Sequence, residues 1–312
     1  MLRVVFMGTP EFAVPTLKIL HEANYNIVGV VTQPDRPKGR GQRLTASPIK
    51  EYACSHNLPV FQPERIKTPE FVEQLRLIRP DIIVVVAYGQ ILSEEILALP
   101  PFGCINVHAS LLPEYRGAAP IHWALINGAT KTGITTMHMA RGLDTGDMIL
   151  KEELPISDTD STGTLHDKLS ELGAALLLET VRQLEAGIAP RERQDDTLAS
   201  YASLLKREHE WLKWEKTARE LHNQVRGLNP WPGAYTTHRA RKLKIWRAEP
   251  LAGNNTLQAP GTISQIDKDG IVVVTGYGSL RLLEVQPENA KRMLAVEYAR
   301  GHHLEAGEQM GV

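Results

Sequence analysis

Cys104-Ile105-Asn106-Val107-His108-Ala109-Ser110-Leu111-Leu112-Pro113 is the stretch that decides how the rest of the chain is interpreted. Residues 104–108 form a short apolar run with the pattern of a β-strand, and in a strand residues two apart face the same side. Asn106 and His108 can therefore point into one small volume. An amide donor beside an imidazole suits stabilisation of an oxyanion that forms on a carbonyl, and the imidazole can also move a proton.

A third polar residue comes from the turn Gly142-Leu143-Asp144-Thr145-Gly146-Asp147, between predicted strands at 133–139 and 148–154. Its glycines allow the backbone to bend closely around whatever Asp144 touches. Asp144 is the candidate to orient the imidazole of His108. Taken singly, each piece fits equally well a strand end with a surface histidine, or a glycine-rich hairpin.

Strands and helices alternate along the first half of the chain. Apolar runs at 2–7, 27–31 and 82–87 read as buried strands, and hydroxyl-bearing N-caps at Ser47, Thr68 and Ser93 mark the starts of helices. This alternation predicts an α/β fold with a doubly wound, mostly parallel sheet, in which ligands bind outside the carboxyl ends of the strands. Gly8-Thr9-Pro10-Glu11 lacks the glycines of a dinucleotide-binding turn.

Length and composition indicate an ordinary two-domain protein. The chain has 312 residues, 42% of them hydrophobic, and a formal charge of -1. We predict a catalytic domain at 1–188, a linker at 189–206 and a second domain at 207–312, where short β-rich runs favour a small barrel or sandwich. Cys54 and Cys104 have no disulfide or zinc spacing, and no apolar run is long enough to cross a bilayer. We expect a cytoplasmic monomer.

Two segments are basic enough to contact nucleic acid. The loop at 33–43 carries Arg36, Lys38, Arg40 and Arg43 against Asp35 alone. Residues 219–247 carry seven cations and one acid, a local excess of six, interleaved with the aromatic residues Trp231, Tyr235 and Trp246. Rings that stack on bases beside cations that hold phosphates are typical of RNA-binding surfaces. The alternative is a solvated basic loop and a solvated basic face over core tryptophans.

Together, Asn106, His108, the segment 110–113 and the turn at 142–147 resemble the folate-dependent formyltransferases, and the match runs almost from end to end. The resemblance implies a Rossmann-like formyltransferase domain followed by an OB-like β-barrel. It implies that Asn106, His108 and Asp144 are catalytic and surround the formyl group of 10-formyltetrahydrofolate.

The resemblance also assigns the two ligands. Ser110, Leu111, Leu112 and Pro113 would line the folate site, chiefly by shaping the backbone. Arg36, Lys38, Arg40 and Arg43 would bind the acceptor stem of tRNA, with Arg40 as a direct contact. The acceptor implied is methionyl-tRNA, the initiator, which is formylated for translation initiation.

Other functions remain open at this stage. Relatives with the same chemistry formylate a nucleotide-linked sugar amine or glycinamide ribonucleotide, and water in place of the amine would make the protein a 10-formyltetrahydrofolate hydrolase. A non-catalytic RNA-binding protein is a further alternative. His108, His122, His138 and Asp144 lack the spacing of a metal motif, so we expect no metal.

Overall fold

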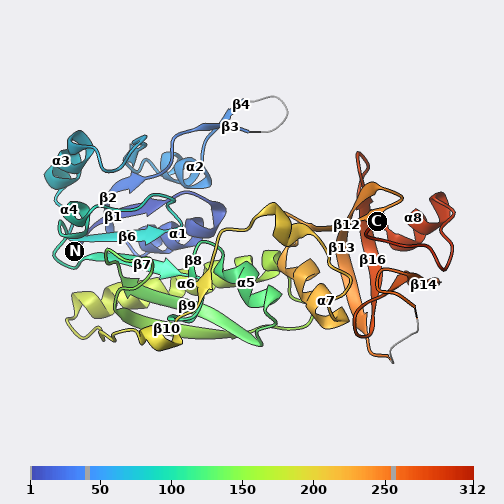
Figure 1. The fold of residues 1–312 in the computed structure, drawn as a ribbon. Helices are drawn as coiled ribbons and strands as arrows, with labels where there is room; N and C mark the ends of the chain where they lie inside the picture. The colour runs from blue at the N-terminus through green and yellow to red at the C-terminus, as the bar shows by residue number, and fades with distance from the viewer. Residues whose placement is uncertain (1, 39–42, 254–257) are drawn as a thin grey trace. The chain divides into compact units, whose positions relative to one another are not determined.

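The computed structural model describes residues 2–38, 43–253 and 258–312 (Figure 1). It divides into two compact units, each assembled from separate stretches of chain. The first unit comprises Met1–Gly117, Thr132–Pro155 and His166–Ala202, and the second comprises Ala118–Lys131, Ile156–Leu165 and Ser203–Val312. The domain boundaries proposed from the sequence stay a prediction.

A seven-stranded sheet forms the centre of the first unit, with strand order β10-β9-β7-β6-β1-β2-β5. From β7 to β5 neighbouring strands are parallel, whereas β9 runs antiparallel to β7. The predicted mostly parallel sheet is thus confirmed. The strands are β1 (Arg3–Gly8), β2 (Asn26–Val31), β5 (Val60–Phe61), β6 (Ile82–Val86), β7 (Cys104–His108), β9 (Lys131–His138) and β10 (Met148–Pro155).

Helices cover both faces of this sheet. On one face α3 (Pro69–Ile78) and α4 (Glu94–Leu97) pack on a cluster that includes Cys104 and Val85. On the other, α6 (Thr162–Glu185) brings Gly173 against Val107. Because Val107 lies between them in the strand, Asn106 and His108 share the face of Cys104.

The predicted helix starts are confirmed by side-chain caps. Ser47, Thr68 and Ser93 accept hydrogen bonds from the backbone N–H groups of Lys50, Phe71 and Ile96. Each cap satisfies a donor that the first turn of a helix leaves free. The other helices of this unit are α1 (Val14–Glu22), which follows the 3₁₀ turn η1 (Glu11–Ala13), and α2 (Pro48–Ser55).

The short edge strand β5 of the main sheet and two small pairs of strands in the first unit were not predicted. The two ends of the basic loop pair with each other as short strands, with β3 (Arg36–Lys38) antiparallel to β4 (Arg43–Thr45). Further along, β8 (Arg116–Gly117) pairs with β11 (Tyr201–Ala202), which is preceded by the 3₁₀ turn η2 (Asp196–Leu198). Strands this short carry too few residues to show a period in the sequence.

The second unit contains an antiparallel sheet that closes into a barrel, which confirms the predicted OB-like domain. Its strand order is β12-β13-β16-β15-β14, with β17 beside β16. Residues 307–311 close it, because Ile263 of β14 exchanges hydrogen bonds with Gly307 and Glu308, while Gly311 donates to Thr237 of β12. The strands are β12 (Ala234–His238), β13 (Arg241–Leu251), β14 (Ile263–Ile266), β15 (Ile271–Val274), β16 (Ser279–Pro287) and β17 (Met293–Leu294).

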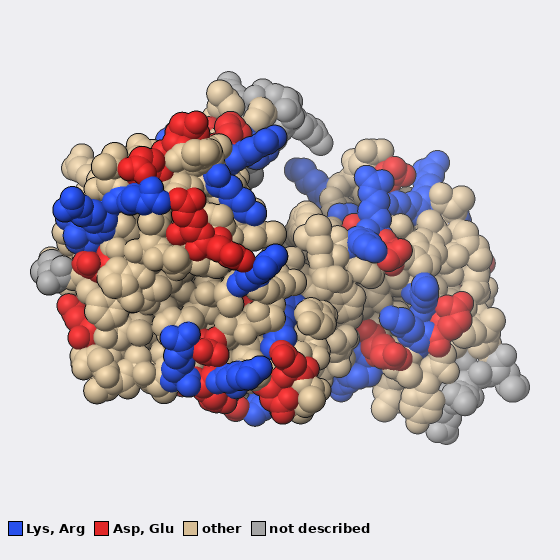
Figure 2. Space-filling model, turned by 60° about the vertical axis from the view of Figure 1, so that its left-hand side comes forward, with Lys and Arg blue, Asp and Glu red and all other residues tan. Residues whose placement is uncertain are grey.

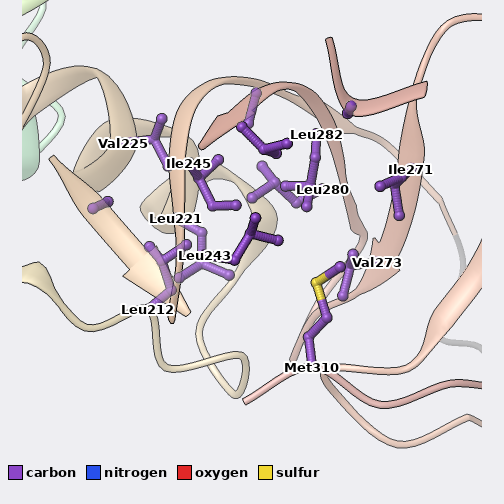
Figure 3. Packing of buried hydrophobic residues seen from close by; sticks show 14 of the residues in the cluster. Leu212, Leu221, Val225, Leu243, Ile245, Ile271, Val273, Leu280, Leu282 and Met310 are labelled. Carbon is purple, nitrogen blue, oxygen red and sulfur yellow. The ribbon is translucent and has the colours of Figure 1, made fainter. Parts of the chain in front are cut away.

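Buried apolar side chains from strands and helices fill this barrel (Figure 3). Leu221 and Val225 of α7 (Ala218–Gly227) meet Leu243 and Ile245 of β13 in the same cluster. The remaining helical segments of this unit are α5 (Pro120–Ile126), η3 (Arg207–Glu210) and α8 (Ala295–Gly301). None of the helices in the described ranges is long and apolar enough to span a membrane.

Candidate active site

Asn106 and His108 lie at the carboxyl end of β7, where the strand arrangement predicts a ligand site. His108 is 6% exposed, and its Nε2 lies 3.0 Å from the backbone oxygen of Tyr115. Asn106 is half-buried, and its carboxamide makes no hydrogen bond with another described residue. Its N–H donors are therefore free to bind a ligand oxygen.

Asp144 lies in the turn between β9 and β10 and brings its carboxylate to His108. Oδ2 of Asp144 lies 3.7 Å from Nδ1 of His108 and accepts a 2.8 Å hydrogen bond from the N–H of Gly117. Gly117 has φ +118°, a conformation that favours glycine. In the turn itself, a Cβ on Gly146 would overlap the carbonyl oxygen of His138, so this position requires glycine.

Both ring nitrogens of His108 thus face oxygen acceptors. A neutral imidazole has one N–H, whereas the protonated ring has two and can donate on both sides. The 3.7 Å gap to Asp144 is an ion-pair distance, longer than a hydrogen bond. The arrangement can hold a positive imidazole against a carboxylate and exchange a proton through Nδ1.

A buried polar network that sequence reasoning missed fixes the Asp144 turn. Gln194 donates from Nε2 to the carbonyl oxygens of Asp144 and Gly146, at 2.7 and 2.8 Å. Its Oε1 accepts from Nε and Nη2 of Arg116, whose side chain is 2% exposed and also bonds Asp196. Gln194 lies within the stretch predicted to be a linker, and nothing in its sequence neighbourhood signals the contact.

The segment 110–113 is held by internal bonds. Thr135 Oγ1 donates to the carbonyl oxygen of Ser110 and accepts from the N–H of Leu112, while the Ser110 hydroxyl donates to Glu114. Leu112 packs against Met137 and Met148. These side chains are occupied within the protein, so Ser110 and Leu112 can contribute to a ligand site mainly through the shape of their backbone.

The basic loop is only partly described. Arg36 is exposed, whereas for Lys38 and Arg43 the structure describes the backbone alone, and Arg40 lies outside the described residues. The loop's one acid, Asp35, accepts hydrogen bonds from Lys50 and Gln62, which lower the pKa of its carboxyl group. Its charge is balanced by Lys50 and does not offset the cations of the loop.

In the second unit, Lys and Arg side chains gather over part of the surface (Figure 2). The local excess counted in the sequence is smaller in space, because acids from other segments pair with four of its cations. These pairs are Arg219 with Asp158, Arg239 with Glu308, Lys242 with Glu210 and Arg247 with Glu284.

Part of the basic face does carry aromatic rings. Trp231 is 66% exposed and lines a cavity of about 460 Å³ with Tyr235 and Lys244. The ammonium group of Lys242 lies 3.7 Å from the centre of the Tyr235 ring, and the guanidinium of Arg292 lies 4.1 Å from that of Trp246. Trp246 and Trp214, in contrast, are buried.

In the described part of the chain, no group of three or more His, Cys, Asp and Glu side chains is placed to hold a metal ion. His108 and Asp144 come together, but not in such a group.

Comparison with protein families matches both halves of the chain. A model described as formyl transferase matches residues 2–181, and one described as formyl transferase, C-terminal domain, matches residues 204–303. Methionyl-tRNA formyltransferase of Bacillus subtilis is 53% identical, with 100% of this chain and 98% of that protein covered. The enzyme of the same name from Acetivibrio thermocellus is 50% identical, over 99% of this chain and all of that protein.

Solved structures share the fold at low sequence identity. The methionyl-tRNA formyltransferase from Clostridium thermocellum superposes with a TM-score of 0.56 at 17% identity, covering 88% of this chain and all of that one. HypX from Aquifex aeolicus, solved in complex with tetrahydrofolic acid, has a TM-score of 0.64 at 14% identity, covering 99% of this chain and 48% of the other.

Proposed function

The chain belongs to the formyl transferase family, and we propose that it transfers the formyl group of 10-formyltetrahydrofolate to the free α-amine of methionyl-tRNA. The product is N-formylmethionyl-tRNA, the initiator of translation, and the place of action is the cytoplasm. The proposal rests on relatives that are at least 50% identical over nearly the full chain and bear this activity in their names. No metal takes part, and the enzyme acts as a monomer.

Asn106, His108 and Asp144 carry out the chemistry in this proposal. The amine nitrogen attacks the formyl carbon, a C–N bond forms, and negative charge develops on the formyl oxygen. The free N–H donors of Asn106 bind that oxygen, the positive charge of a protonated His108 adds electrostatic stabilisation, and loss of a donor such as Asn106 typically slows turnover ~10²–10³-fold. The bond to the folate nitrogen then breaks, and the proton lost by the amine passes to that nitrogen.

The single observation that carries this assignment is the convergence of these groups at the end of β7. The carboxylate of Asp144 lies 3.7 Å from His108, and Asn106 has its amide free on the same face of the strand. Asp144 orients the imidazole from that distance. The backbone of 110–113 shapes the folate site beside them.

Each unit contributes a surface for tRNA. The cations of the basic loop, Arg36, Lys38, Arg40 and Arg43, bind the acceptor stem in this proposal. The second domain adds phosphate contacts that position the substrate without reading its sequence, so affinity falls steeply with salt.

The test is to incubate the purified chain with 10-formyltetrahydrofolate and methionine-charged tRNA and to ask by mass spectrometry whether the amino acid becomes formylated. Formylmethionine on the tRNA supports the proposal. Release of free formate without transfer identifies a hydrolase instead. Tight tRNA binding without either product identifies a non-catalytic RNA-binding protein.

A further inference from the structure

The second unit holds a cavity of about 310 Å³ that includes none of the candidate active-site residues. Trp123 of α5, Gln224 of α7 and the segment 208–216 form its wall. This volume lies at the lower end of the range of ligand pockets, about 300–1,000 Å³. It is large enough for one ring system with a sugar and too small for a folded macromolecular element.

Two half-buried tryptophans give the cavity flat apolar walls. Trp123 is fixed by a 2.8 Å hydrogen bond from Nε1 to the carbonyl oxygen of Ser203 and by edge contact with the ring of His209. Trp211 meets the ring of Tyr235 edge-on, with centroids 5.3 Å apart. Aromatic side chains held in this way are suited to stack on a planar ligand.

A buried hydrogen-bond acceptor in the wall has no protein partner. Gln224 is 5% exposed, and its Nε2 donates to the carbonyl oxygens of His209 and Trp211, which fixes the orientation of the amide. Its Oε1 is left without a hydrogen bond among the described residues. A buried acceptor in this state is unusual in a folded protein.

The edge of the cavity is basic. Lys213 and Lys216 line it, both are exposed, and neither forms an ion pair with a described residue. The one acid in the wall, Glu208, lies 3.7 Å from His209 and 3.9 Å from Lys206. Two exposed ammonium groups beside an aromatic cavity match a phosphate attached to a planar ring.

From these features we propose that the cavity binds one unpaired nucleotide of the tRNA substrate. The base stacks on Trp123 and Trp211, and its phosphate binds Lys213 and Lys216. This inference rests on the proposed function for its source of nucleotide, because the chemistry alone fits a free nucleotide equally well.

The first arm of the test titrates the full chain with AMP, CMP and ribose 5-phosphate and follows the intrinsic tryptophan fluorescence. Either nucleotide should quench the signal and ribose 5-phosphate should not, since it has no base to stack. Trp211→Leu and the double variant Lys213→Ala/Lys216→Ala should each weaken nucleotide binding about ten-fold, the scale of one lost stacked base. Tyr277→Leu and Lys268→Ala, which alter exposed side chains outside the cavity, should bind as the wild type does.

The second arm measures formyl transfer at varied concentrations of charged tRNA. The same two variants should raise KM for charged tRNA about ten-fold and leave KM for 10-formyltetrahydrofolate unchanged. The double lysine variant is the safer of the two, because both side chains are exposed and their removal leaves the core intact.

If nucleotides fail to bind, or bind all variants equally, the proposed nucleotide binding in the cavity is wrong. This holds even if the enzyme is active. Nucleotide binding with an unchanged KM for tRNA would overturn tRNA as its source. A wild-type chain without transfer activity would instead refute the proposed function, and the titration would still decide whether the cavity binds a nucleotide.

Discussion

The carboxylate of Asp144 contacts both His108 and the backbone N–H of Gly117. One substitution can distinguish the roles of these two contacts. Asp144→Asn keeps an oxygen that can accept from the N–H of Gly117 but removes the charge that faces His108. We predict that kcat falls about 100-fold or more, whereas the dissociation constant for 10-formyltetrahydrofolate is unchanged. Steady-state kinetics and a folate-binding titration measure the two effects.

Asp147→Asn is the matched control, since Asp147 lies in the same turn but pairs with Arg191 at the surface. Its kcat should stay within a few-fold of the wild type. An unchanged kcat in Asp144→Asn would mean that Asp144 is only a turn residue.

Gln194 positions the Asp144 turn without belonging to it, and its removal should affect both folding and rate. Gln194→Leu leaves the buried guanidinium of Arg116 without one acceptor and frees the turn. We expect the free energy of unfolding in urea to drop by about 2–3 kcal/mol, the scale of a lost hydrogen bond to a charged group. The kcat should drop as well.

Gln74→Leu, at an exposed position of α3, controls for the loss of a glutamine as such. If Gln194→Leu unfolds at the same urea concentration as the wild type, the network does not support the site.

At the scale of elements, we expect the basic loop at 33–43, whose ends form β3 and β4, to bind the tRNA. Replacing Arg36, Lys38, Arg40 and Arg43 together by alanine should raise KM for charged tRNA, because phosphate contacts and their released counterions are lost. Slow formylation of a small amine by the same variant should be unchanged. Equal losses on both acceptors would show that the hairpin serves the active site and not the tRNA.

Glu308 lies in the segment that closes the barrel, and its ionisation should make the stability of the fold depend on pH. Hydrogen bonds from His238, and then from Arg239, lower the pKa of Glu308 from 4.5 to about 2. A carboxyl group with a lowered pKa stabilises the folded state above its ordinary pKa, and this contribution is lost as pH falls from 4.5 toward 2.

Glu308→Gln should therefore cost stability near neutral pH and progressively less as the medium is acidified below 4.5. Urea unfolding of both proteins at several pH values measures the difference. A difference that stays constant down to about pH 3 would mean that ionisation of Glu308 does not contribute to closure.

At the scale of the whole molecule, the longer strands and helices of the first unit were predictable because each shows its period in the sequence, unlike the two-residue strand β5. Apolar runs marked the strands, and Ser47, Thr68 and Ser93 marked the helix starts, each with its predicted cap bond. The hairpin of β3 and β4 and the pairing of β8 with β11 were not predictable, since two- and three-residue strands are fixed by their partners.

The candidate site, too, has features that the sequence predicts and features that it does not. The spacing of Asn106 and His108 on one strand is a local property, so the sequence alone predicted their shared face. The contact of Gln194 with Arg116 joins residues 78 positions apart and leaves no local pattern. The basic face was overestimated for a related reason, because the acids that pair with Arg219 and Arg239 come from segments far along the chain.

The central claim is that a free amide at the end of β7 stabilises negative charge on the formyl oxygen. Asn106→Asp preserves the shape of the side chain and replaces its N–H donors with a carboxylate that repels the oxyanion. The decisive measurement is the single-turnover rate of formyl transfer to methionine-charged tRNA, with 10-formyltetrahydrofolate saturating. A rate at least ~10²–10³-fold below the wild type, with folate affinity retained, is the predicted result. A rate within a few-fold of the wild type would contradict it.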